Sequence, residues 1–195
     1  DKYIPVWSSE VEAGTSDPDG YYHSIVKQAL LLVYSDTKFD ATSAPTDYSD
    51  LWTNSAFHGK YEVPTQLAQI TPRIILSSIL VRHQDPNGEL GISAKGWEEL
   101  SAFLKNGVPA VEGEDFYTNL AAGKVDIGTA VSGTLKAKQE QHKVTVGIVA
   151  PEIGTPTIIE QIALVKGSKN TETAKEFIDW FGSAEVQGAF SAKFN

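Results

Sequence analysis

The strongest fold signal in this chain is the segment Val63-Pro64-Thr65-Gln66-Leu67-Ala68-Gln69-Ile70-Thr71-Pro72-Arg73-Ile74-Ile75-Leu76-Ser77-Ser78-Ile79-Leu80. It has the pattern of a buried strand end, a short polar loop and the start of a helix. Thr71 is predicted as the N-cap and Pro72 as the first helical residue, where a missing N–H costs nothing. The apolar residues that follow recur at helical spacing, so this helix is expected to pack against a core.

The loop before this helix carries uncharged hydrogen-bonding side chains. A helix N-terminus carries roughly half a positive charge and exposes free N–H groups, so it suits an anionic group. Arg73 could add a positive charge there, although an arginine at this position more often lies on the solvent face. The alternative is an ordinary capped helix after an ordinary loop. The candidate binding residues of this segment are Thr65, Gln66, Gln69, Thr71 and Arg73.

The composition is that of a folded globular chain and excludes several classes of function. The chain has 195 residues, of which 41% are hydrophobic and 21% charged, and its net charge of −9 argues against nucleic acid or an anionic membrane as partner. It contains no cysteine, which excludes disulfides and a cysteine nucleophile. No apolar run approaches the ~20 residues that span a bilayer, and we expect no signal peptide within these residues. Because the chain also lacks methionine, we expect a fragment or a processed form.

The order of predicted elements is strand, helix, strand, helix, which indicates an α/β layer fold. The continuous apolar run at 29–34 is typical of a strand covered on both faces. We therefore expect a mixed, mostly parallel sheet of five or six strands with helices on both faces. Further strands are expected at 60–64, 125–130, 144–149 and 158–166, and helices at 71–82, 93–106, 114–122, 135–142 and 170–181, with a last helix after 183.

Three predicted strand-to-helix loops, at 64–71, 130–134 and 151–156, share a composition rich in Ser, Thr, Gly and Gln and poor in charge. In open α/β sheets, ligands bind outside the carboxyl ends of the strands. We therefore expect these loops to form a polar, uncharged binding surface; the alternative is that they only connect elements. The candidates from the second and third loops are Ser132, Gly133, Thr134, Gly154 and Thr155.

The patterns of common enzyme sites are absent from the sequence. There is no Gly-x-Ser-x-Gly elbow, no P-loop and no Gly-x-Gly-x-x-Gly motif. The four histidines are scattered, and the close carboxylates are interpreted as charges at helix starts. We therefore expect a binding protein with no catalytic residues and no cofactor, rather than an enzyme.

Three segments resemble a known family, the bacterial solute-binding proteins of ABC importers with the type II periplasmic-binding-protein fold. The resemblance is to the second lobe in the group that binds ferric iron, phosphonates, thiamine or polyamines. It covers nearly all of the chain. The segments are Asp17-Pro18-Asp19-Gly20-Tyr21-Tyr22 through Leu32-Val33-Tyr34-Ser35, Tyr48-Ser49-Asp50-Leu51 to Val63-Pro64, and Pro151-Glu152-Ile153-Gly154-Thr155-Pro156 with 163–170 and 174–180.

The resemblance implies a two-lobed protein that closes over its ligand. Residues 1–24 would then be a hinge segment between the lobes and residues 25–195 a ligand-binding lobe, with the first lobe absent from this sequence. The three loops would line the interlobe cleft. The implied partners are a small-molecule or ion ligand and a membrane permease, for a monomer located outside the cytoplasm, in the periplasm or as a cell-surface lipoprotein.

The ligand expected from this resemblance is ferric iron, alone or with an anion, or a phosphonate- or phosphate-type anion. In ferric-binding members a tandem tyrosine pair follows the strand that is here 125–130, but this sequence has Val131-Ser132-Gly133 at that place. Direct ligation of iron by tyrosinates of this loop is therefore not expected, and the metal ligands stay unknown. The alternative function is the effector-sensing domain of a transcription regulator, which uses the same architecture.

Overall fold

The computed structural model describes residues 1–194, which form two compact units. The first unit contains Asp1–Gln28 together with the C-terminal part from Thr157 onward, and the second contains Ala29–Pro156. In this division the C-terminal helices belong with the N-terminal segment, and the expected role of residues 1–24 as a hinge stays a prediction. The chain leaves the first unit after Gln28, within the strand His23–Ser35, and returns to it at Thr157, the first residue of the strand Thr157–Ile162.

The larger sheet is built around the long strand β1 (His23–Ser35), as the continuous apolar run predicts. Its neighbours are β5 (Ile127–Val131), β6 (Val146–Ile148) and β7 (Thr157–Ile162). Both β5 and β6 run antiparallel to β1, with Leu32 opposite Thr129 and Val33 opposite Ile148.

A second, two-stranded sheet pairs β2 (Glu62–Val63) with β4 (Val108–Pro109) in parallel. A single parallel bridge between Tyr61 and Ile127 links it to β5. The α/β class and the mixed sheet are confirmed. The expected single sheet of five or six mostly parallel strands was wrong in detail, because the described ladders of β1 with β5 and β6 are antiparallel.

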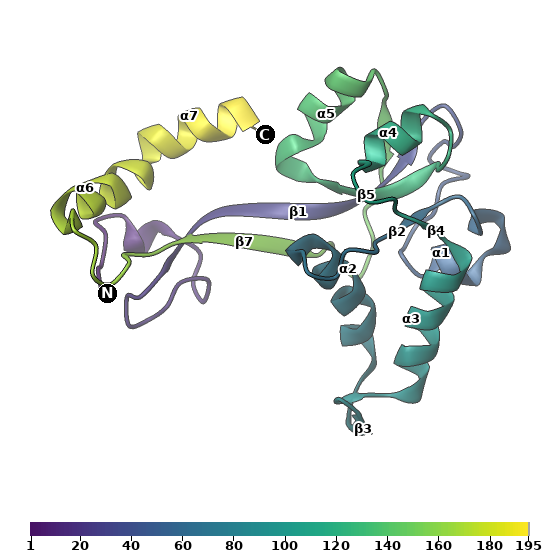
Figure 1. The fold of residues 1–195 in the computed structure, drawn as a ribbon, viewed down its shortest axis with the longest axis horizontal. Helices are drawn as coiled ribbons and strands as arrows, with labels where there is room; N and C mark the ends of the chain where they lie inside the picture. Colours follow the sequence, from purple (N-terminus) through teal and green to yellow (C-terminus); the bar gives the residue numbers. More distant parts are fainter. Residues whose placement is uncertain (195) are drawn as a thin grey trace. The chain divides into compact units, whose positions relative to one another are not determined.

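The helices lie where the apolar spacing predicts them, with small differences at their ends. In the second unit, α4 and α5 lie on one side of β1 and β5, and α1, α2 and α3 lie on the other (Figure 1). The bounds are α1 (Asp50–Thr53), α2 (Ile70–Leu80), α3 (Ala94–Asn106), α4 (Phe116–Ala121) and α5 (Leu135–His142), with 3-10 turns at Ser8–Glu10, Ser55–Phe57, Val81–His83 and Ser132–Thr134.

The expected N-cap of α2 was wrong. The N-cap residue is Gln69, and its side chain makes no capping hydrogen bond, so Thr71 and Pro72 lie inside the first turn. Proline is still tolerated there, because the first four N–H groups of a helix have no partner within the helix. After α2, the segment 84–89 forms a short strand, β3 (Gln84–Glu89), which folds back through bridges to Ile92.

A hydrophobic cluster packs α4 and α5 against the sheet of the second unit. Val33 and Leu31 contribute from β1, because residues two apart on a strand point to the same face. Phe116, Tyr117 and Leu120 contribute from α4. This packing fixes the start of α4, and so the position of the loop that precedes it.

The first unit contains the C-terminal helices α6 (Thr171–Phe181) and α7 (Ala184–Phe194). Trp7, Leu164 and Ile178 form its small core. The Trp7 indole N–H donates to the carbonyl oxygen of Ile178 at 3.0 Å, so the N-terminal segment is held against α6. Among the described residues, no helix is both long and apolar enough to cross a membrane.

Candidate functional site: a pocket at the ends of two parallel strands

The second unit contains a pocket of about 690 Å³ beside the carboxyl ends of β2 and β4. Because these two strands are parallel, the segments that follow them leave the sheet at the same edge. Both segments line the pocket, together with the first turns of α2 and one residue of β5. Its lining residues are Glu62, Pro64, Thr65, Gln66, Gln69, Thr71, Pro72, Ile75, Ala110, Val111, Glu112, Gly113, Glu114, Asp115 and Thr129.

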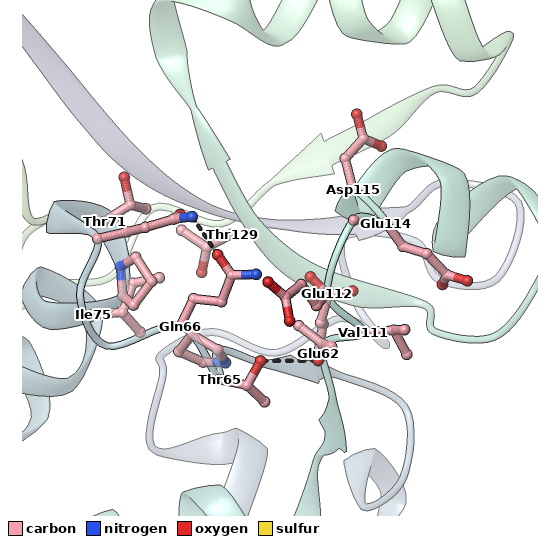
Figure 2. A pocket seen from close by; sticks show the side chains of 15 residues that line it. Glu62, Thr65, Gln66, Thr71, Ile75, Val111, Glu112, Glu114, Asp115 and Thr129 are labelled. Atoms are coloured by element: carbon pink, nitrogen blue, oxygen red, sulfur yellow. Dashed lines mark hydrogen bonds between the residues drawn. The ribbon is translucent and has the colours of Figure 1, made fainter.

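Hydrogen bonds hold the two segments beside each other at this edge. The Ala110 N–H donates to the Val63 carbonyl oxygen at 2.9 Å, and the Thr65 hydroxyl donates to the Ala110 carbonyl oxygen, also at 2.9 Å. The side-chain amide of Gln69 donates to that of Gln66. Figure 2 shows Thr71 and Gln66 on one side of the pocket, opposite the segment that follows β4. Backbone groups thus take part in both hydrogen bonds that join the two segments, and other polar side chains of the lining stay available for a ligand.

Four carboxylates line this pocket: Glu62, Glu112, Glu114 and Asp115. The expectation of an uncharged ligand surface did not include the segment after β4, which supplies three of these acids, and it stays a prediction for the loop after β2. It considered only the loops that follow strands with clear apolar patterns, whereas three of the acids follow the two-residue strand β4. The signal was present in the sequence as the run Glu112-Gly113-Glu114-Asp115, which was interpreted as charges at a helix start.

That interpretation is correct for Asp115, which is the N-cap of α4. Its carboxylate accepts from the Thr118 N–H at 2.9 Å and forms an ion pair with Lys138 at 2.6 Å. Glu114 is paired with Lys124 at 2.9 Å. Glu112 is exposed and has no ion-pair or hydrogen-bond partner in the described part of the chain. The pocket therefore keeps a net negative character despite the two nearby lysines.

The pKa values of two lining acids shift in opposite directions. Burial raises the pKa of Glu62, and the nearby charges of Asp115 and Glu114 raise it further, against a hydrogen bond from Asn119 that lowers it. Burial alone would raise the pKa of Asp115 as well, but the hydrogen bonds from Lys138 and the Thr118 N–H outweigh it and the pKa is lowered. A positive charge in the pocket would therefore relieve the repulsion felt by Glu62.

Of the residues predicted in the first loop, four line the pocket: Thr65, Gln66, Gln69 and Thr71. Arg73 does not line it. Its side chain is exposed and donates from Nε to the Gln69 carbonyl oxygen at 3.3 Å, so it lies along the solvent face of α2. The structure thus brings most of this predicted set together, while a role in ligand binding stays a prediction.

The second predicted loop does not line this pocket. Ser132, Gly133 and Thr134 form a 3-10 turn that connects β5 to α5. The Ser132 hydroxyl accepts from the Ala29 N–H at 3.0 Å, at the end of the β1–β5 ladder. The Thr134 hydroxyl donates to the Val131 carbonyl oxygen at 3.3 Å. These side chains support the turn, and their predicted contact with a ligand stays a prediction.

The third predicted loop lies beside a different pocket, of about 590 Å³. Glu152 and Ile153 line it, together with the ion pair that Arg82 forms with Asp47 at 2.6 Å. The predicted residues Gly154 and Thr155 line neither pocket. Gly154 has a φ of +100°, so its place is fixed by a turn that a side chain would strain.

The carboxylates of the first pocket do not converge on one point. Among residues 1–194 there is no group of three or more His, Cys, Asp or Glu side chains that could hold a metal ion. In Figure 2, Glu62 and Glu112 lie near the centre, and Glu114 and Asp115 lie to one side. The carboxylates of this pocket are therefore spread along its wall instead of forming one cluster.

The chain matches the family described as bacterial extracellular solute-binding protein over residues 1–195, and it belongs to that family. It is 31% identical over 192 residues to the probable ABC transporter periplasmic-binding protein y4fP of Sinorhizobium fredii, covering 98% of this chain and 52% of that protein. The chain thus spans about half the length of this curated relative.

Solved structures share the fold at lower identity. A Trichodesmium protein (IdiA, FutA), described as a complex with iron and citrate ligands, has a TM-score of 0.75 at 24% identity over 100% of this chain and 62% of that one. A protein described as mediating signal transduction in a two-component system has a TM-score of 0.80 at 18% identity, over 100% of this chain and 61% of that one. Family membership confirms the recognised class and the expectation that the chain is not an enzyme, because the family and the curated relative are named for solute binding outside the cytoplasm.

Proposed function

We propose that this chain is part of the solute-binding component of an ABC importer, and that the pocket beside β2 and β4 forms one wall of its ligand site. The protein would capture a solute outside the cytoplasm and deliver it to a membrane permease. The observation that carries the proposal is the pocket's place at the carboxyl ends of two parallel strands, where α/β sheets bind ligands. The relationship to a periplasmic-binding protein of an ABC transporter supports it.

Within the ligand classes expected from the sequence, the pocket favours ferric iron held with an anion over a free phosphonate. Carboxylate oxygens are hard ligands that suit a highly charged metal ion, and Glu112 has no basic partner among the described residues. A phosphonate without a metal would be repelled by Glu112, whose charge no lysine of the described residues compensates. The opposite wall contains the N-terminus of α2 with Thr71 and Gln69, and this end suits the accompanying anion.

A ferric ion in this pocket would need more coordinating atoms than the described acidic and histidine side chains of the second unit supply. Because the described residues contain no cluster that could hold a metal by itself, the remaining coordination would come from the anion and from the rest of a longer protein. The Trichodesmium protein, described with iron and citrate, supports a metal–anion pair as cargo. The effector-sensing alternative is supported only by a fold-level likeness to the two-component protein, so transport is the better-supported function.

The test is a calorimetric titration of the full-length protein with ferric citrate, citrate alone and methylphosphonate. We expect binding of ferric citrate and at least about tenfold weaker binding by Glu112→Gln, because a hydrogen bond to a charged group is worth roughly 1.5–3 kcal/mol. The control is Glu98→Gln, an exposed glutamate on α3 away from the pocket. Binding of methylphosphonate without binding of ferric citrate would reject the metal. Equal affinities for both glutamate variants would reject this pocket as the site.

A further inference from the structure

Asn119 is a buried polar residue at a position that packing alone would fill with an apolar side chain. It is 4% exposed and lies on α4 between Tyr117 and Leu120, two members of the hydrophobic cluster that packs against the sheet. Its Oδ1 atom has no hydrogen-bond partner among the described residues. A buried amide with an unpartnered oxygen destabilises a fold, so stability does not explain the presence of this side chain.

The nitrogen of the same amide has a specific partner. Nδ2 donates to Oε2 of Glu62 at 2.8 Å, and this bond joins α4 to β2. Turning the amide over would place Oδ1 against the carboxylate, where two acceptors would meet, so the orientation with the N–H groups toward Glu62 is the favourable one. Because Asp115 caps the start of α4, Asn119 offers its donor from a fixed place.

Glu62 keeps its second carboxylate oxygen available. Oε1 accepts no hydrogen bond in the described part of the chain and, unlike Oδ1 of Asn119, it is not shut off from solvent. The two lysines beside the pocket pair with Glu114 and Asp115 instead. Glu62 lines the pocket and lies near its centre in Figure 2. It therefore offers one uncommitted anionic oxygen to a solute.

We infer that Asn119 is the positioning residue for Glu62, and that Oε1 of Glu62 contacts the positively charged part of the solute. Because the pocket beside β2 and β4 is the proposed ligand site, this role rests on the function proposed above. By holding Oε2, the amide restricts rotation of the carboxylate and leaves one oxygen for the cargo. Hydrogen bonds of this kind orient metal-binding groups. Asn119 does not itself line the pocket, so it acts through Glu62.

The test is a double-mutant cycle on the binding of ferric citrate by the full-length protein. Asn119→Leu removes the donor and keeps a side chain of similar size, and Glu62→Ala removes the group that is positioned. We expect Asn119→Leu to weaken binding about tenfold, the scale for loss of a hydrogen bond that orients a metal-binding group. In the Glu62→Ala background the same substitution should change the affinity by less than about twofold, because nothing is left to position.

The cycle separates positioning from support of the fold. Equal weakening by Asn119→Leu in both backgrounds would show a structural role and overturn the inference. So would an unchanged affinity of Asn119→Leu when Glu62→Ala binds weakly. If Glu62→Ala binds normally but Glu112→Gln binds weakly, the pocket stands as the ligand site and only the inference fails. If neither variant is weakened, or if ferric citrate does not bind at all, the proposed site fails and the inference fails with it.

Two further variants complete the experiment. Asn54→Ala is the control, because the Asn54 side chain accepts from the Ala56 N–H at 3.0 Å and does not line the pocket. We expect its affinity for ferric citrate to equal that of the unsubstituted protein. Circular dichroism checks that each variant is folded. If Asn119→Leu does not fold, Asn119→Ala takes its place in the cycle with the same expected and contradicting results, since it removes the donor without adding apolar volume.

Discussion

The Asn119 side-chain amide donates a hydrogen bond to the Glu62 carboxylate, with Nδ2 and Oε2 separated by 2.8 Å. The bond joins α4 to Glu62 of β2, which lines the pocket. Asn119 is only 4% exposed, and its Oδ1 has no partner among the described residues. A buried, partly satisfied amide therefore holds one of the two carboxylates that lie near the centre of the pocket.

This pair leads to a prediction about stability and pH. The raised pKa of Glu62 means that the folded protein binds a proton more readily than the unfolded chain. Stability therefore falls as pH rises from the ordinary value of 4.5 through the raised folded value, and the loss is complete above that value. Glu62→Gln removes the charge and keeps an oxygen for Asn119. We expect a higher Tm at pH 7 and a vanishing difference near pH 4.

The measurement is thermal unfolding of both proteins across this pH range, monitored by circular dichroism. Glu98→Gln serves as the control, because it removes the charge of an exposed glutamate on α3. A Tm for Glu62→Gln at pH 7 equal to or below that of the unsubstituted protein would contradict the argument from burial.

The larger elements were predictable from sequence because their cores have clear periodicity. The run 29–34 is covered on both faces and lies in β1. Ala174, Phe177, Ile178 and Phe181 recur at helical spacing and predict α6, but only Ala174 and Ile178 of this stripe pack into the small core, and Phe177 is 51% exposed. Ser93 was expected to start a helix, and its hydroxyl accepts from the Gly96 N–H at the N-terminus of α3. In these cases the local sequence pattern predicts the same element that the tertiary packing stabilises.

The site was only half predictable. The segment after β2 follows an apolar strand and was recognised, whereas β4 is two residues long and gives no periodic signal. The acids at 112–115 belong to the pocket only because β4 pairs in parallel with β2, and such pairing between segments far apart in the chain is not encoded in local spacing. For the same reason the strands β5 and β6 were predicted, but their antiparallel direction relative to β1 was not.

Ser132 gives a second prediction, which tests whether its side chain stabilises the turn after β5. Its hydroxyl accepts from the Ala29 N–H at the end of the β1–β5 ladder. Ser132→Ala leaves this amide without its partner, and we expect a loss of about 1 kcal/mol in the free energy of unfolding. Urea denaturation of Ser132→Ala and of Ser77→Ala, an exposed serine on α2, measures it. If both variants lose equally little, the Ser132 bond carries no stability.

The contact between α6 and the N-terminal segment gives a third prediction. A Cβ added at Gly182 would clash with the indole ring of Trp7, whereas one added at Gly188 meets nothing within 4 Å. We expect Gly182→Ala to lower the free energy of unfolding by ~1–3 kcal/mol, the usual cost of overpacking. Gly188→Ala should be neutral or stabilising by up to ~1 kcal/mol. Thermal unfolding of the full-length protein tests the pair, and a milder effect at Gly182 than at Gly188 would contradict this packing.

The last prediction concerns which of the expected loops contacts the solute. Gln66 lines the pocket beside β2 and β4, and Thr155 lines neither described pocket. Both are polar residues of predicted strand-to-helix loops, so composition alone treats them alike. In the full-length protein we expect Gln66→Ala to weaken binding of ferric citrate by about 1 kcal/mol, the usual scale for one lost hydrogen bond, and Thr155→Ala to leave it unchanged. Calorimetric titration distinguishes them, with unfolding curves confirming that both variants are folded. If Thr155→Ala weakens binding and Gln66→Ala does not, the ligand wall lies along the loop at 151–156, and the carboxylates beside β2 and β4 serve another purpose.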